Sequence, residues 1–600
     1  MGQTRSLSLW IVLLLAVGVG LVYFVPHVVQ LLWGDNYNPL EPTVFGPDEA
    51  LYTAGVREVL EGNFLPSDLA VVEHKEESFF YPPLPFMVMA LFTVLVGGVF
   101  SALIMADVVF SALAFFLFYV IARRLLKSDH LAVVCSLVFV FFYRFFIPVG
   151  FSSFSSVFDH VVHNLFYTGG TPAYLWFARF VHPQIPMVLF LGFLGVLFVA
   201  FEQRKRWQFL TAGLLFGLMF YSYFYLWTFV AAFLGILFVV LYVQKKKTLS
   251  MSVLFSGIVG VIVGIPYLIH FYFVSGADLA LRSGVEVGRF VEPISVVYAV
   301  LVVLLIVFTH IRNNAAVFLA SLMAAGIVAL NVQLLFGYTV QNNHWNSRII
   351  VSVLILLFFY GFSRLLHFFR ATSYRVLFWP VVILLFTMAI HLQVQEVISV
   401  HDAVHFSPAE QQLLDWMSNT FTPDDVLLSS DLRWNVLIPA YTAGNVYFPY
   451  GAMTLSSDEE MQERFVLTYK FLGKSVDEVQ KQLTANSAYT RSARSDLPLD
   501  KNYNSFLRSY IFVDTIYPVK VGVFRKMHVY NSTLVDALIM RYEAEEFSVA
   551  NLFKYKVDYV LLVGDERKLQ SGLVNDLRQQ GYNMTMVFEN DEFVMLEINV

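Results

Sequence analysis

Long apolar runs separated by short polar stretches fill roughly the first 395 residues of the chain. Many of these windows exceed 18 apolar residues with little or no charge, which is enough for an α-helix to cross a bilayer. The first run, 7–33, is too long for a signal peptide and lacks a small-residue cleavage site, so we expect it to remain as a span. The pattern predicts spans near residues 8–32, 101–122, 131–149, 185–201, 208–225, 226–243, 251–273, 293–310, 315–336, 348–368 and 376–393.

Lysines and arginines gather in alternate connections between these runs, and they decide the expected orientation. The clusters are Arg5; Arg123, Arg124 and Lys127; Arg204, Lys205 and Arg206; Lys245, Lys246 and Lys247; Arg312; and Arg364, Arg370 and Arg375. Cytoplasmic loops carry an excess of Lys and Arg, so this side is expected to be the cytoplasm. The opposite, external face then receives residues 34–82, 150–184, 275–292 and 337–347 and everything after about 394.

The segment 83–98 is apolar but only about 15 residues long, which is marginal for a full span. If it crossed the membrane, the basic clusters at 123–127 and 204–206 would both move to the external side. We therefore expect a re-entrant or interfacial helix here, and eleven spans with an external C-terminus. A count of twelve spans is the alternative, and it conflicts with the charge pattern.

The last 200 residues are ordinarily polar and predict a soluble, mixed α/β domain. Ser407 and Glu410 form a capping-box pattern with a proline at the first helical position. Short apolar runs that predict strands alternate with helix-like stretches, and the tail reads as a β-hairpin turning at 590–591. The expected strands lie at 426–428, 446–450 and 558–563, and the expected helices include 457–470 and 542–554. We thus expect a transmembrane domain over 1–395 and an external domain over 396–600.

Composition agrees with a membrane protein and excludes several other classes. Hydrophobic residues make up 58% of the chain and charged residues 14%. The single cysteine, Cys135, excludes disulfides and cysteine-based metal sites. No HExxH, GxSxG or complete P-loop motif occurs, so nucleotide hydrolysis by a known motif is not expected. No nucleic-acid partner is expected either.

Four polar clusters lie on the predicted external side. They are Asp48 and Glu49; Arg179, His182 and Gln184; Arg282, Glu286 and Arg289; and Gln341, His344, Trp345 and Arg348. Each also has a structural interpretation: an acidic pair favoured by a helix dipole, a snorkelling arginine, a solvated loop and an interfacial tryptophan. Their convergence on one face, under a topology drawn from other charges, favours a functional site.

Carboxylates and arginines at one membrane face suit a particular kind of reaction. A carboxylate can take the proton of a hydroxyl or amine acceptor. Arginines can hold a phosphate leaving group through two parallel hydrogen bonds and offset the charge that develops on it. A sugar linked to a lipid phosphate would present such chemistry at this depth.

The first external loop carries a more specific pattern. It contains Asp48, Glu49, Tyr52, Arg57, Glu58 and Leu60, followed by Pro82, Pro83 and Leu84. The pattern resembles the first external loop of GT-C glycosyltransferases, particularly the protein mannosyltransferases and lipid A aminoarabinose transferases. In that group a membrane-hugging helix follows the Pro-Pro pair, in agreement with the expectation for 83–98. The match covers about 55 residues, and the rest of the chain agrees in outline.

The resemblance implies that Asp48 is the catalytic base and that the donor is a polyprenyl-phosphate sugar. We expect Glu49 to orient the acceptor or a cation, and a divalent ion, Mg²⁺ or Mn²⁺, at this pair is the one candidate cofactor. Many members of the group have a lysine before Pro-Pro, near the lipid phosphate, where this chain has Tyr81. The candidate substrate-binding residues are therefore Tyr52, Arg57, Lys75, Tyr81, Arg179, His182, Arg282, Gln341, His344, Trp345 and Arg348.

The sequence thus predicts an inverting membrane glycosyltransferase that acts on the external face of the plasma membrane. Its expected partners are the lipid-linked donor, membrane lipids and a protein, lipid or glycan acceptor. The missing Trp-Trp-Asp motif argues against transfer of whole oligosaccharides to asparagine. A transporter or flippase of lipid-linked sugars is the main alternative, although no repeated halves are found. A non-enzymatic scaffold would leave the Asp48 and 341–348 clusters unexplained.

Overall fold

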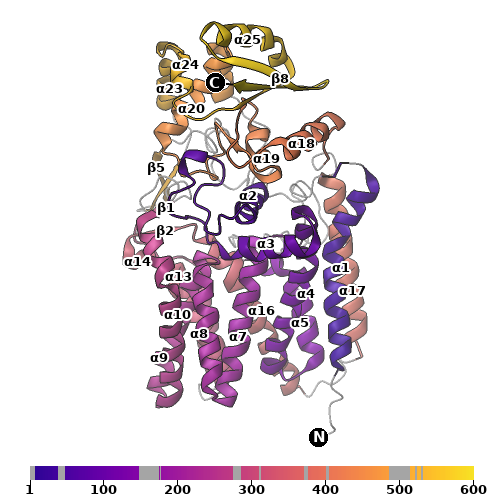
Figure 1. The fold of residues 1–600 in the computed structure, drawn as a ribbon. Helices are drawn as coiled ribbons and strands as arrows, with labels where there is room; N and C mark the ends of the chain where they lie inside the picture. Colours follow the sequence, from indigo (N-terminus) through magenta and orange to yellow (C-terminus); the bar gives the residue numbers. More distant parts are fainter. Residues whose placement is uncertain are drawn as a thin grey trace. The chain divides into compact units, whose positions relative to one another are not determined.

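The structure is a computed structural model that describes residues 7–34, 36–37, 48–147, 175, 177–274, 285–309, 313–369, 376–400, 405–484, 514–520, 523–528 and 532–599. It divides into two compact units (Figure 1). The helical unit comprises Met1–Trp33, Leu91–Ile269 and Val287–His401. The α/β unit comprises Gly34–Ala90, His270–Glu286 and Asp402–Val600, so it takes in the first loop as well as the C-terminal region.

Long apolar helices make up the helical unit, and each expected span overlaps one of them. They are α1 (Leu9–Trp33), α4 (Val99–Leu126), α5 (Asp129–Phe141), α7 (Ile185–Gln203), α8 (Arg206–Phe220), α9 (Phe224–Val243), α10 (Lys247–Val274), α12 (Ile294–Thr309), α13 (Asn314–Leu330), α16 (Val351–Phe368) and α17 (Phe378–Val400). Among the described residues, eight helical stretches are long and apolar enough to cross a membrane. The integral-membrane class is therefore confirmed, whereas the count of eleven spans is not, because α5, α8 and α12 are shorter.

Shorter elements connect these helices. They are α14 (Gln333–Phe336), α15 (Asn343–Trp345), the strands β1 (Val285–Val287) and β2 (Tyr338–Val340), the 3₁₀ turn η2 (Tyr143–Phe146) and two turns of π-helix, η3 (Phe180–Gln184) and η4 (Asn346–Ile350). The expected helix at 83–98 is α3 (Leu84–Val96). Its 13 residues span about 20 Å at 1.5 Å per residue, less than the ~30 Å apolar core of a bilayer. An interfacial or re-entrant position for α3 stays a prediction.

Glycines let two helices of the bundle pack closely. A Cβ atom on Gly213 of α8 would lie 2.8 Å from the backbone oxygen of Ser256 in α10. In return, Gly260 and Gly264 of α10 face the rings of Phe216 and Phe220 in α8. In a lipid environment, where burial of apolar surface gives helices no reason to associate, such small-residue seams allow the close van der Waals contact that holds them together.

A five-stranded sheet forms the centre of the α/β unit, with strand order β4-β3-β7-β9-β8. The strands are β3 (Val426–Leu428), β4 (Asn445–Val446), β7 (Tyr559–Val563), β8 (Asn583–Glu589) and β9 (Phe593–Asn599). β4, β3 and β7 are parallel, whereas β9 runs antiparallel to β7 and β8. The expected strands at 426–428 and 558–563 and the hairpin turn at 590–591 are confirmed, whereas the expected strand at 446–450 is wrong beyond Val446, where β4 ends. In a second sheet, β5 (Asp514–Lys520) and β6 (Val523–His528) are antiparallel neighbours.

Helices accompany this sheet, and α25 packs against β8 (Figure 1). They are α18 (Pro408–Thr420), α19 (Leu432–Tyr441), α20 (Asp458–Phe471), α21 (Val476–Thr484), α23 (Ser532–Ala544), α24 (Val549–Leu552) and α25 (Gln570–Gln579), with the 3₁₀ turn η7 (Gly564–Leu569) before α25. The capping box of Ser407 and Glu410 begins α18, as expected. The expected helix at 542–554 is interrupted, because α23 ends at Ala544 and Ser548 caps a new helix, α24.

Hydrogen bonds make the first loop an integral part of the α/β unit. The amide of Val446 in β4 donates to the carbonyl oxygen of Ala70 at 2.9 Å, so the loop lies along the edge of the sheet. The buried carboxylate of Asp68 accepts hydrogen bonds from the amides of Ala70, Val71 and Leu455 and from the hydroxyl of Thr454. These bonds satisfy a carboxylate that would otherwise be costly to bury.

A network of charges also ties the first loop to α20. The fully buried guanidinium of Arg464 pairs with Glu460 at 2.7 Å and with Glu73 at 3.1 Å, and it lies over the ring of Tyr555. Glu73 belongs to the 3₁₀ turn η1 (Val72–His74) of the loop. His74 of the same turn is hydrogen-bonded to Glu460 at 2.9 Å. A buried guanidinium in contact with two carboxylates and an aromatic ring fixes the loop firmly.

Candidate functional site

The predicted site residues are divided between the two units. The acidic pair lies at the start of α2 (Asp48–Leu60) in the α/β unit, where the positive end of the helix dipole favours carboxylates. The Asp48 side chain lies outside the described part of the chain. Glu49 is buried, and Tyr52 lies one turn further along the same helix. Both roles assigned to the acidic pair stay predictions.

Three other candidates in the first loop contact protein groups of the α/β unit. Arg57 donates through Nε to the carbonyl oxygen of Ala440, at the end of α19. Lys75 pairs with the buried carboxylate of Glu58. The hydroxyl of Tyr81 donates to the carbonyl oxygen of Ala452. These contacts hold α2 and the following loop in place, and the substrate roles of Arg57, Lys75 and Tyr81 stay predictions.

In the helical unit, the 341–348 cluster meets two tyrosines from α9 and its preceding turn. The hydroxyl of Tyr223 and Nδ1 of His344 are hydrogen-bonded at 2.7 Å, and the hydroxyl of Tyr225 donates to Oε1 of Gln341 at 3.3 Å. Trp345 is buried and donates through Nε1 to the carbonyl oxygen of Tyr225 at 3.1 Å. Trp345 is thus a packing residue inside the bundle rather than an interfacial anchor.

Arg348 and Arg179 come from different parts of the chain, but their charges act on the same group. Both act electrostatically on the hydroxyl of Tyr223, and Arg348 also acts on the hydroxyls of Tyr143 and Tyr225. Arg179 is almost fully buried, with 2% of its surface exposed. The helical unit therefore brings together two of the four predicted clusters, together with three tyrosines that the sequence did not single out.

The backbone at both arginines departs from regular α-helix. Arg179 immediately precedes the π-turn η3, which leads into α7, and Arg348 lies in the π-turn η4, which leads into α16. Gln341 has a φ of 39°, in a region that residues other than glycine seldom adopt. π-turns and such strained dihedrals are frequent at functional sites. These features therefore mark the same residues as the charge pattern did.

Two further candidates cannot be placed in this cluster. The His182 side chain and all of Arg282 lie outside the described residues, so their predicted roles stay untested. Arg289, from the same sequence cluster as Arg282, donates to the carbonyl oxygens of Leu334 and Leu335. It thus satisfies backbone groups at the end of a helix.

The structure adds Asp107 and His27, which the sequence analysis missed. Nε2 of His27 lies 2.9 Å from Oδ2 of Asp107, and both residues are buried within spans. A carboxylate in the middle of the apolar run 101–122 is a signal that was available in the sequence. It lies outside the loops and span ends from which the candidate residues were drawn.

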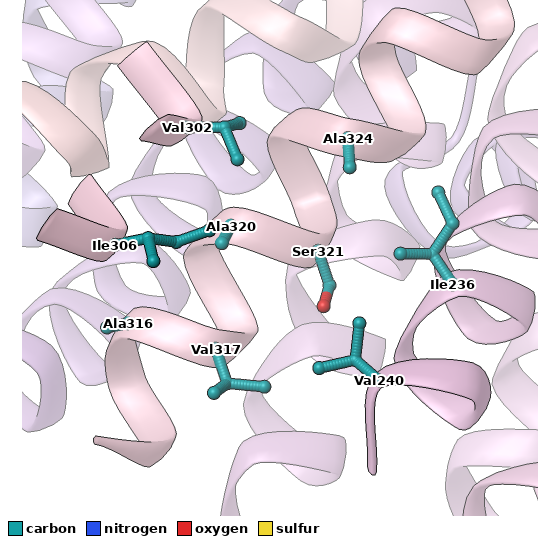
Figure 2. A pocket seen from close by; sticks show the side chains of 9 residues that line it. All are labelled: Ile236, Val240, Val302, Ile306, Ala316, Val317, Ala320, Ser321 and Ala324. Carbon is teal, nitrogen blue, oxygen red and sulfur yellow. The ribbon is translucent and has the colours of Figure 1, made fainter. Parts of the chain in front are cut away.

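A cavity of about 110 Å³ opens between α9, α12 and α13 (Figure 2). Its lining is apolar apart from the hydroxyl of Ser321, which points into it: Ile236, Val240, Val302, Ile306, Ala316, Val317, Ala320, Ser321 and Ala324. Val240 lies 15 residues along α9 from Tyr225, which is about 22 Å at 1.5 Å per residue. The cavity is therefore separate from the arginine and tyrosine cluster and lacks the charged groups that a lipid phosphate needs.

Among the described residues, no group of three or more His, Cys, Asp or Glu side chains could hold a metal ion. The carboxylate of Asp48 is outside this set. A divalent cation at Asp48 and Glu49 stays a prediction, and no step of the proposed reaction depends on it.

Comparisons with known proteins found similarity among solved structures. No protein-family profile and no curated protein sequence matches the chain. One is the crystal structure of ArnT from Cupriavidus metallidurans in the apo state, whose sequence is 12% identical; the match covers 98% of this chain and 97% of that one, with a TM-score of 0.45. A second is the crystal structure of the same ArnT bound to undecaprenyl phosphate, with 13% identity over 98% of each chain and a TM-score of 0.47.

A third similar structure is the archaeal oligosaccharyltransferase AglB from Archaeoglobus fulgidus, in complex with an inhibitory peptide and a dolichol-phosphate. It is 13% identical, over 94% of this chain and 80% of that one, with a TM-score of 0.41.

Proposed function

We propose that this membrane protein is a glycosyltransferase that moves a sugar from a polyprenyl-phosphate donor to an acceptor on the external face. The observation that carries the proposal is the polar cluster in which the hydroxyl of Tyr223 is hydrogen-bonded to His344 at 2.7 Å and the hydroxyl of Tyr225 donates to Gln341 at 3.3 Å, next to the π-turn η4 that holds Arg348. Arginine side chains whose charges act on Tyr223, together with tyrosine hydroxyls, suit a lipid phosphate, because a phosphate at a partly dry site needs cations and hydrogen-bond donors. The acidic pair of α2 supports the same proposal from the other unit.

In the proposed reaction, the acceptor hydroxyl or amine attacks the anomeric carbon of the donor sugar. The new bond forms as the bond between that carbon and the phosphate oxygen breaks, and the configuration at the carbon inverts. The acceptor proton passes to the carboxylate of Asp48, and the polyprenyl phosphate leaves with the bonding electron pair. Glu49 orients the acceptor. Arg179 and Arg348 stabilise the charge that develops on the leaving phosphate.

The residues from 341 to 348 would have a supporting role in this reaction. The bond of His344 to Tyr223 and the bond of Gln341 to Tyr225 hold the tyrosine hydroxyls against the segment that leads into Arg348. Burial of Trp345 against α9 fixes the turn that carries Arg348. Such preorganised groups contribute to catalysis because they need no reorientation as charge develops.

Lipid analysis of cells tests the proposal whatever the identity of the sugar. Cells that carry Asp48→Asn in place of the wild-type chain should accumulate one polyprenyl-phosphate sugar, which mass spectrometry of extracted lipids identifies. Asp591→Asn, which changes an exposed carboxylate at the turn between β8 and β9, is the matched control and should leave the lipid profile unchanged. An unchanged lipid profile in the Asp48→Asn cells, with the variant present at the wild-type level, would contradict the proposal.

A further inference from the structure

A chain of buried polar contacts runs through the helical unit from α1 to η3, the turn that follows Arg179. His27 of α1 lies 2.9 Å from the carboxylate of Asp107 in α4. The other carboxylate oxygen, Oδ1, accepts a hydrogen bond at 2.5 Å from Nε2 of Gln184, the last residue of η3. All three residues are buried, with exposures of 3%, 8% and 0% in the order His27, Asp107 and Gln184.

Gln184 links this pair to the backbone that precedes the turn. Its Nε2 also donates to the carbonyl oxygen of Phe177 at 2.5 Å, and its backbone amide donates to the carbonyl oxygen of Arg179 at 3.0 Å. At the start of the same segment, the amide of Phe177 donates to the hydroxyl of Tyr23 in α1 at 3.3 Å. The backbone on either side of Arg179 is thus held by side chains from α1 and α4.

We propose that Asp107 is a positioning residue, which acts through Gln184 to hold the Arg179 guanidinium where it binds the phosphate of the lipid donor. The inference rests on the proposed function, because it assigns Arg179 to the phosphate. Asp107 does not itself touch substrate.

The cost of the arrangement favours this role over simple packing. An ionisable carboxylate inside a span is expensive to hold, and an apolar side chain of similar size would pack α4 against its neighbours at lower cost. Unlike an apolar residue, Asp107 accepts a hydrogen bond from the side-chain amide of Gln184. The same amide also donates to the carbonyl oxygen of Phe177. The segment that Asp107 holds through Gln184 is a π-turn, a form of backbone that is frequent at functional sites.

The test measures binding of two probes, undecaprenyl phosphate and dolichyl phosphate, to the full-length protein in nanodiscs. Asp107→Leu should weaken binding of the preferred probe about tenfold or more, and Arg179→Gln should weaken it to a similar extent. Asp107→Asn keeps an oxygen that can accept from Gln184, so it should retain affinity within about threefold of the wild type. Ser256→Ala, which removes a buried bond between α10 and α8, is the matched control and should bind as the wild type does.

The double variant separates positioning from a structural role. If Asp107 acts through Arg179, adding Asp107→Leu to Arg179→Gln should weaken binding no further. Additive losses in the double variant, or an Asp107→Leu variant that binds as the wild type does, would overturn the positioning role. If Asp107→Leu does not yield folded protein, Gln184→Leu replaces it, because this variant keeps the His27–Asp107 pair. Binding is then compared among Gln184→Leu, Arg179→Gln and the double variant.

The same experiment distinguishes the two proposals from each other. Suppose that the wild type binds a probe, that Arg179→Gln weakens this binding, and that neither Asp107→Leu nor Gln184→Leu does. The positioning role then fails and the proposed function stands. If the wild type binds neither probe, the proposed function fails and the positioning role fails with it.

Discussion

At the scale of single residues, Arg348 is the most direct test of the phosphate site. Arg348→Lys keeps the positive charge and the length to reach a membrane interface, but it loses the planar group that makes two parallel hydrogen bonds. We expect undecaprenyl phosphate to bind this variant about tenfold or more weakly, as measured in nanodiscs. Arg364→Lys is a matched control, since Arg364 is exposed and lies 16 residues further along the chain, in α16. Wild-type affinity in Arg348→Lys would mean that Arg348 is a helix anchor.

The pairing of His74 and Glu460 predicts a pH dependence of stability. The pKa of His74 is raised to about 9, chiefly by its hydrogen bond to Glu460. A raised folded-state pKa means that the pair stabilises the fold fully below the unfolded-state pKa of about 6.5, and that this stabilisation is lost as the pH rises through about 9. The melting temperature of the wild type should therefore exceed that of His74→Gln by an amount that is largest near pH 6 and disappears above about pH 9. A difference that stays constant between pH 6 and 10 would contradict this account.

The candidate residues show how far the sequence could predict the site. Gln341, His344, Trp345 and Arg348 are neighbours in the chain, so their grouping was visible without a structure. Tyr223 and Tyr225 come from another helix, and nothing in their local sequence indicates that they meet His344 and Gln341. The same holds for Asp68, whose partners Thr454 and Leu455 lie almost 400 residues away and form bonds that only tertiary folding creates.

At the scale of helices and strands, the close packing of α8 against α10 at glycines predicts that two glycine-to-alanine substitutions change the stability of the protein in opposite directions. Alanine is favoured over glycine inside a helix by up to ~1 kcal/mol. Gly213→Ala should nevertheless destabilise the protein by about 1–3 kcal/mol, because the new methyl group would lie 2.8 Å from the backbone of α10. Gly257→Ala, also in α10, meets nothing within 4 Å and should be neutral or stabilising. Thermal unfolding in detergent compares the two, and equal shifts would mean that the seam is not tightly packed.

Elements with local signals were predicted best. The apolar runs, the capping box before α18 and the hairpin turn at 590–591 each depend on residues close in sequence, and each is present. The interruption between α23 and α24 was missed although Ser548 is an ordinary helix cap, because the apolar spacing continues across it. Span number is harder, since α5, α8 and α12 are too short to be decided by length and hydropathy alone.

At the scale of the whole molecule, the predicted orientation can be tested by labelling. The one native cysteine, Cys135, is buried, so a Cys135→Ser background allows single cysteines to be introduced. In intact cells, a membrane-impermeant maleimide should label Asp591→Cys at once and Lys246→Cys only after permeabilisation, because the Lys/Arg pattern predicts a cytoplasmic position for residue 246. The reverse pattern would contradict the external position of the C-terminal domain and of the proposed active site.

The central claim is that Asp48 takes the acceptor proton during sugar transfer. Removing a general base typically lowers a rate by about 10²–10⁴-fold. The most direct measurement is therefore the turnover of purified Asp48→Asn with the donor lipid identified from the accumulating cells, alongside donor binding and thermal unfolding of the same sample. The account predicts a turnover about 10²–10⁴-fold below that of the wild type, with binding and unfolding nearly unchanged. Near-wild-type turnover by a well-folded Asp48→Asn protein would contradict it.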